Sequence, residues 1–120
     1  MTGKEFLRQY IMIDRQVRSI KLQLDSTKEL LSKNMLNDFF KPGIDDLTDN
    51  LKSLISKSVI VKENILDKIQ TIENNECREI LIKHYIELKT VSCISKEMFM
   101  TRQGVYYHLR VGEKAISELI

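Results

Sequence analysis

The sequence predicts an all-α protein with a long helical hairpin over residues 1–73 and a group of shorter helices over residues 74–120. Two observations indicate this class. Over the first 33 residues, apolar side chains recur in alternating steps of four and three, which is the spacing of a helix face. The chain of 120 residues also has only one proline and four glycines, too few turn signals for a β-sandwich.

The composition excludes several classes of protein. Charged residues make up 30% of the chain, and it lacks the run of about 18 apolar residues that would predict a membrane span. The amino terminus also lacks the apolar stretch of a signal peptide, so we expect a cytoplasmic protein. The formal net charge of +2 does not by itself identify a nucleic-acid-binding protein.

Metal and cofactor sites are not expected. The candidate soft-metal ligands are Cys77, His84, Cys93 and His108, and their spacing matches no zinc motif. Two cysteines do not form a disulfide framework. No glycine-rich phosphate loop or local set of nucleophile, base and acid is present, so the sequence does not predict an enzyme.

Residues 2–33 are predicted to form one helix. Thr2 is the expected N-cap, and Glu5 completes a capping box. Such a one-sided helix needs a partner that covers its apolar face. The predicted seam consists of Phe6, Tyr10, Ile13, Val17, Ile20, Leu24, Thr27 and Leu31.

Residues 34–46 interrupt the pattern, and Pro42–Gly43 is the strongest turn signal in the chain. We expect a turn there, with Phe39 and Phe40 at one end of the hairpin. A second helix is predicted over about residues 46–73. Its first turn would be acidic, which the helix dipole favours. The acidic residues are Asp45, Asp46 and Asp49.

The second helix has an apolar arc that is wider than a two-helix hairpin needs. One stripe contains Leu47, Leu51, Leu54, Ser58, Val61, Ile65 and Ile72, and a second contains Ile55, Val59, Leu66 and Ile69. The extra apolar surface can be covered either by residues 74–120 or by a second copy of the protein. The sequence favours a homodimer but leaves both arrangements open.

Three shorter helices are predicted after residue 73. Asn74–Asn75 offers an N-cap for a helix over Arg78 to Leu88, and a second helix is expected over Val91 to Met98. Phe99–Met100 forms a tight junction before Thr101, the N-cap of a last helix that runs to the C-terminus. The buried face of this last helix is predicted to contain Val105, Leu109, Gly112, Ile116 and Leu119.

This order of helices is typical of a helix-turn-helix unit. The last helix of such a unit presents its amino-terminal residues to base edges in the major groove. An arginine there can bind guanine and a glutamine can bind adenine, and Thr101 at the helix amino terminus can bind a phosphate. No acidic residue lies between Met98 and Gly112. The candidate base-contacting residues are Arg102, Gln103, Tyr106 and Tyr107.

At these residues the chain resembles region four of bacterial sigma factors. The resemblance lies in Arg78-Glu-Ile-Leu-Ile-Lys-His-Tyr-Ile86, in Val91-Ser-Cys-Ile-Ser95 and in Thr101-Arg-Gln-Gly-Val105. Tyr85, Ile94, Thr101 and Val105 stand at positions of the family pattern. The chain departs from the pattern at Cys93, Ser95 and Phe99, the last of which stands where glycine or a small polar residue is common.

The start Lys-Glu-Phe-Leu-Arg-Gln-Tyr, followed by Ile-Asp-Arg-Gln, extends this resemblance. The layout is similar to small Gram-positive phage and mobile-element transcriptional regulators of the ArpU, RinA and LtrC type. The resemblance implies a regulator of the late-gene-activator type that acts on promoter DNA, with RNA polymerase as a further partner.

For such a regulator we expect double-stranded DNA as the main partner, bound by a homodimer whose two recognition helices contact half-sites about one DNA turn apart. Most of the affinity would come from phosphates. The candidate phosphate-contacting residues are Thr101, Lys89, Lys96, Arg110 and Lys114.

Two alternative functions remain open. In the first, the helix-turn-helix binds RNA polymerase or another regulator as a protein-only adaptor. In the second, the chain is a DNA-packaging recognition subunit, a class that usually places its DNA-binding unit first and forms rings. A mass measurement separates a dimer from a ring.

Overall fold

The computed structural model describes the backbone of residues 1–33 and 37–120 and the side chains of residues 1–30 and 43–120. The predicted all-α class and the long hairpin are confirmed. Two compact units are present, unit 1 with residues 1–11 and 61–120 and unit 2 with residues 12–60. The helices are α1 (Gly3–Lys33), α2 (Asn37–Gln70), α3 (Asn75–Tyr85), α4 (Val91–Glu97) and α5 (Arg102–Leu119).

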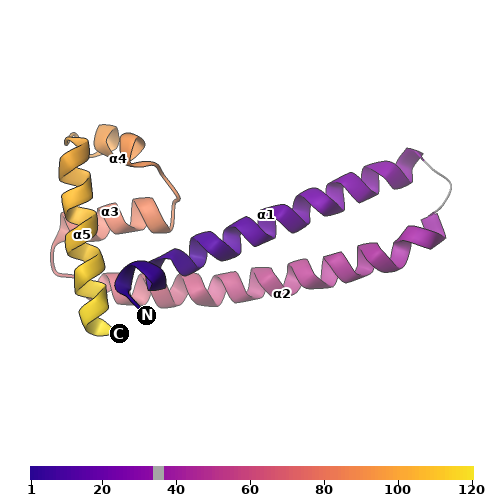
Figure 1. The fold of residues 1–120 in the computed structure, drawn as a ribbon, viewed down its shortest axis with the longest axis horizontal. Coiled ribbons are helices and arrows are strands. Elements are labelled where there is room, and N and C mark those ends of the chain that lie inside the picture. Colours follow the sequence, from indigo (N-terminus) through magenta and orange to yellow (C-terminus); the bar gives the residue numbers. More distant parts are fainter. Residues whose placement is uncertain (34–36) are drawn as a thin grey trace. The chain divides into compact units, whose positions relative to one another are not determined.

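Within unit 2, the segments of α1 and α2 run side by side in opposite directions (Figure 1). On α1, Ile13 and Leu24 are buried, while Val17, Ile20 and Thr27 are half-buried. These seam residues thus belong to the less exposed part of α1, and Leu31 lies outside the described side chains. On α2, the first-stripe residues Leu47, Leu51, Leu54 and Ser58 are half-buried, as are Ile44 and Thr48 beside them.

The predicted turn at Pro42–Gly43 is wrong. Both residues lie inside α2, which begins at Asn37 rather than near residue 46. Pro42 is the sixth residue of α2, one turn beyond the helix start, where a proline removes one backbone hydrogen bond of the helix. The expected acidic cluster therefore lies beyond the first turn of α2. The side chains of Phe39 and Phe40, predicted to lie at the end of the hairpin, are outside the described residues.

The core of unit 1 joins the last three helices to the first turns of α1 and the final turns of α2. Leu7 is fully buried here, although it lies outside the predicted seam. Ile69, from the second stripe of α2, is also fully buried in this core. The buried cluster consists of Leu7, Ile65, Ile69, Ile72, Cys77, Ile80, Leu81, Tyr85, Ile94, Val105, Leu109 and Ile116.

Two residues of the second stripe on α2 are exposed. Ile55 is 40% exposed and Val59 is 50% exposed, and both lie in unit 2. Leu66, in unit 1, is half-buried. The wide apolar arc of α2 is thus divided: its carboxyl-terminal part packs in the core of unit 1, and Ile55 and Val59 remain at the surface.

Side-chain caps define the helix starts as the sequence predicts. Thr2 Oγ1 accepts a hydrogen bond from the N–H of Glu5 at 3.2 Å, and Asn74 Oδ1 accepts one from Cys77 N–H at 3.0 Å. Several predicted boundaries are wrong: α2 ends at Gln70 rather than near residue 73, α3 runs from Asn75 to Tyr85 rather than from Arg78 to Leu88, and α4 ends at Glu97 rather than Met98. Leu88 has a φ of 59°, a left-handed conformation that cannot continue a right-handed helix. No helix in the described part of the chain is long and apolar enough to span a membrane.

Candidate nucleic-acid interface

Helix α5 has a buried side and an exposed side. Val105, Leu109 and Ile116 are buried in the core of unit 1, which confirms these residues as part of the predicted buried face of the helix. Leu119, predicted on the same face, is 45% exposed at the end of the helix. The opposite side contains every candidate base-contacting residue. The exposed side chains are Arg102, Gln103, Tyr106, Tyr107 and Arg110.

Two contacts fix α5 against α3. The hydroxyl of Tyr85 donates a hydrogen bond to Glu113 Oε1 at 2.6 Å. Burial and this hydrogen bond raise the pKa of the Tyr85 phenol above its ordinary value. One residue earlier on α5, a Cβ at Gly112 would lie 2.6 Å from Leu81 Cδ1, so only glycine allows this approach of the two helices.

A second pair of polar contacts joins the start of α3 to the middle of α5. The Cys77 thiol donates to the carbonyl oxygen of His108 at 3.1 Å, and His108 Nε2 lies 3.3 Å from Glu76 Oε2. Burial raises the pKa of the Cys77 thiol, so this group stays protonated rather than nucleophilic. His84 and His108 are both half-buried, as expected for helix residues.

The amino terminus of α1 packs on the last turns of α5, and both chain ends lie at this place in Figure 1. The N–H of Gly3 donates to Ser117 Oγ at 2.6 Å. A Cβ on Gly3 would overlap the carbonyl oxygen of Glu113. The carboxyl-terminal half of α5 is therefore held between the start of α1 and α3.

The connection between α4 and α5 places the start of α5 beside α4. Thr101 caps α5 by accepting a hydrogen bond from Gly104 N–H at 3.1 Å, as predicted. Nη2 of Arg102 donates to Ser92 Oγ of α4 at 3.3 Å. Phe99, in the middle of this connection, has a φ of 53° and is 96% exposed.

The candidate phosphate-contacting residues differ in their surroundings. Lys96, Arg110 and Lys114 are exposed, but Lys89 is held by Glu97, with Nζ 2.8 Å from Oε1. Lys83 pairs with the same carboxylate at 3.1 Å. Hydrogen bonds from Lys89 and then Lys83 lower the pKa of Glu97, and the same contact raises the pKa of Lys89.

Gly104 has room for a side chain within the chain itself. The nearest atoms to a Cβ there are Thr101 Oγ1 at 3.4 Å and Met100 Sδ at 3.7 Å, which are ordinary van der Waals distances. Close packing within unit 1 therefore does not require glycine at this position of α5.

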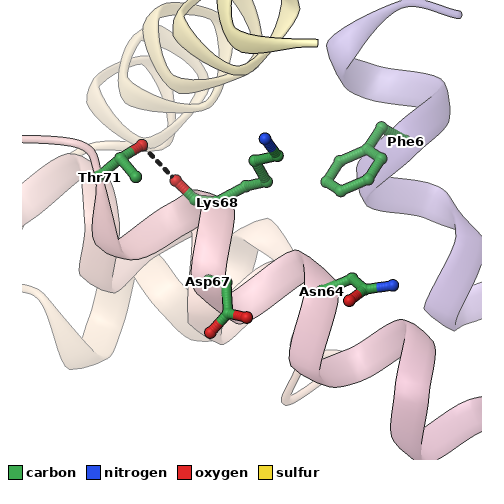
Figure 2. A pocket seen from close by; sticks show the side chains of 5 residues that line it. All are labelled: Phe6, Asn64, Asp67, Lys68 and Thr71. Atoms are coloured by element: carbon green, nitrogen blue, oxygen red, sulfur yellow. Dashed lines mark hydrogen bonds between the residues drawn. The ribbon is translucent and has the colours of Figure 1, made fainter.

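Away from these residues, unit 1 has an open pocket between α1 and α2 (Figure 2). The Thr71 hydroxyl donates to the carbonyl oxygen of Lys68 at 2.6 Å, and Figure 2 shows the Lys68 ammonium directed toward the side of Phe6. None of the predicted DNA-contacting residues lines this pocket. Its lining residues are Phe6, Asn64, Asp67, Lys68 and Thr71.

Sequence reasoning missed Ser92, Glu97 and Phe99 as neighbours of the candidate interface. Of these three residues, only Phe99 could have been singled out from the sequence, because it is an aromatic residue at a position where the sigma-factor pattern favours glycine. The contacts of Ser92 with Arg102 and of Glu97 with two lysines join separate helices, so sequence spacing does not indicate them. Among the described residues, no group of three His, Cys, Asp or Glu side chains is placed to hold a metal ion.

Comparison of the chain with protein-family models, with curated proteins and with solved structures gives no match.

Proposed function

We propose that the chain is a sequence-specific DNA-binding transcriptional regulator that contacts promoter DNA with α5. The observation that carries this proposal is the division of α5 into a buried apolar side and an exposed amino-terminal side without acidic residues. The short helix α4, the tight connection and the capped α5 fit a helix-turn-helix of the sigma-region-four type. In that unit α5 is the recognition helix.

The exposed residues in and around α5 form two groups, those suited to base edges and those suited to phosphates. Arg102 and Gln103, in the first turn of α5, have the donors and acceptors that bind guanine and adenine edges. Tyr106 and Tyr107 are 51% and 58% exposed one turn further along, so their rings are available to the same groove. Phosphates would be contacted by Thr101, Lys96, Arg110 and Lys114, and by Lys89 when it leaves Glu97.

A homodimer fits this function. Ile55 and Val59 are exposed apolar residues at i and i+4 on α2, the spacing with which one helix packs on another. Pairing two copies through them would bring two recognition helices to one DNA site. The resemblance to phage and mobile-element regulators further supports a late-gene activator that acts in the cytoplasm of a bacterial host, with RNA polymerase as a second partner.

Selection from random-sequence duplexes at about 150 mM salt tests the proposal. The purified protein is mixed with the pool, bound duplexes are sequenced, and the double variant Arg102→Ala/Gln103→Ala is run in parallel. The matched control is Arg15→Ala/Gln16→Ala, which removes an exposed arginine–glutamine pair from α1 instead. We expect an enriched sequence that the control retains and the double variant loses.

The same experiment distinguishes the other functions. If the folded wild-type protein enriches no sequence, the regulator proposal is wrong and the protein-only adaptor is favoured. If the double variant enriches the same sequence as the wild type, α5 is not the recognition helix. A solution mass corresponding to a ring rather than a dimer would favour the DNA-packaging subunit.

A further inference from the structure

Phe99 combines two features that are unfavourable in an isolated protein. Its side chain is 96% exposed, the highest exposed fraction among the large hydrophobic residues that the structure describes. Its φ of 53° lies in the left-handed region, which costs free energy for any residue with a Cβ. A bulky residue in that conformation is a reason to look for a function.

The end of α4 explains why the backbone needs this conformation. The N–H of Met100 donates to the carbonyl oxygen of Ser95 at 3.0 Å, the bond that closes a Schellman motif at the end of a helix. Phe99 occupies the left-handed position of that motif, where glycine is the usual residue. Met100 packs against the core of unit 1 while Phe99 points to solvent. Helix termination therefore requires the left-handed backbone but not the phenyl ring.

The position of Phe99 indicates what the ring can contact. It comes two residues before Thr101, the cap of α5, and three before Arg102. Phe99 is thus an exposed residue in the segment that leads directly into the start of α5, close to the candidate base-contacting residues. The chain from Met98 to Gly112 has no acidic residue, and the nearby carboxylate of Glu97 is paired with Lys83 and Lys89. These surroundings suit an anionic partner such as a DNA duplex.

We propose that Phe99 is a further DNA-contacting residue, whose ring packs on the C5-methyl group of a thymine beside the base pairs contacted by Arg102 and Gln103. This inference rests on the proposed function. The thymine methyl is the apolar group on the base edges of the major groove, and phenylalanine is among the residues that contact it. Phe99 would thus add a thymine preference at the edge of the recognised sequence.

The variant Phe99→Gly tests this inference because it is expected to change stability and binding in opposite directions. Glycine adopts the left-handed conformation without strain, so the thermal midpoint should rise by about 4 °C. Affinity for the duplex selected by the wild-type protein should fall about fourfold or more, the effect of losing a buried methyl contact. The matched control is Leu119→Ala, which removes an exposed apolar side chain from the far end of α5 and should leave the affinity unchanged.

Replacing thymine by deoxyuridine in the selected duplex identifies the contact. Removing the methyl group at one position should weaken binding of the wild-type protein by a similar factor and have no further effect on Phe99→Gly. If Phe99→Gly is folded and binds the duplex as tightly as the wild type, the inference is wrong. If Phe99→Gly binds more weakly but deoxyuridine has no effect at any position, the thymine assignment is wrong. A wild-type protein that binds no duplex would overturn the proposed function as well.

Discussion

The hydroxyl of Tyr85 lies 2.6 Å from Glu113 Oε1, so a buried hydrogen bond joins α3 to α5 beside the close contact of Gly112 with Leu81. Tyr85 is 2% exposed and Glu113 is half-buried. The hydrogen bond between Tyr85 and Glu113 depends on the orientation of its two groups, whereas apolar packing tolerates small rotations of one helix against the other. The two contacts together set the angle at which α5 presents its exposed side.

Replacing Tyr85 by phenylalanine should lower the free energy of unfolding by about 1–2 kcal/mol, because the hydrogen bond is lost while most of the packing remains. Urea denaturation measures this change. Tyr107→Phe is the matched control, since the Tyr107 ring is 58% exposed and its hydroxyl should contribute little. Equal stability of the Tyr85→Phe variant and the wild type would contradict the assigned role of the pair.

The raised pKa of Tyr85 predicts a loss of stability at high pH. The native state favours the neutral phenol, so this contribution is fully present below the unfolded pKa of about 10 and is lost as the pH rises above it. The free energy of unfolding of the wild type should therefore fall more steeply above pH 10 than that of Tyr85→Phe. The slopes should differ by at most about 1.4 kcal/mol per pH unit, and equal slopes would count against the prediction.

Two glycines of α5 should respond oppositely to alanine. Gly112→Ala places a Cβ 2.6 Å from Leu81 Cδ1 and should cost about 1–3 kcal/mol of stability through overpacking. Gly104→Ala meets no atom closer than 3.4 Å and should stabilise the helix by up to about 1 kcal/mol. Thermal unfolding of the two variants compares them directly.

Gly104→Ala also tests how closely α5 approaches DNA. If the backbone of its first turn lies against the duplex, the added methyl group should weaken binding at least tenfold although the protein is no less stable. Titration of the selected duplex measures this affinity. Unchanged affinity would show that the DNA lies further from Gly104.

Glu97→Gln should increase the affinity for DNA. The substitution removes one negative charge and releases Lys83 and Lys89 from their ion pairs, so both become available to phosphates. The dependence of affinity on salt concentration should also become steeper. Glu118→Gln makes the same change in net charge at the far end of α5 and is the control. An equal gain in both variants would indicate a general charge effect rather than the release of the two lysines.

Much of the candidate interface could be predicted from local sequence. Helix starts depend on one capping side chain and the next few N–H groups, so Asn74 and Thr101 were identified correctly. The buried side of α5 follows from apolar spacing, which indicated Val105 and Leu109. The wrong turn at Pro42–Gly43 came from the same local reasoning, since proline is a turn residue in general, whereas here Pro42 is the sixth residue of α2.

The sequence by itself determined the all-α class and the exposed residues of α5, because these depend on the spacing of residues within one helix. Only the tertiary structure decided which residues meet across helices: Leu7 and Ile69 in the core of unit 1, Glu97 on Lys83 and Lys89, and Arg102 on Ser92. It also decided that Gly112 is required by the approach of Leu81 whereas Gly104 is not. Contacts of this kind depend on how the helices pack in three dimensions, and that packing has no signature in the spacing of residues along one helix.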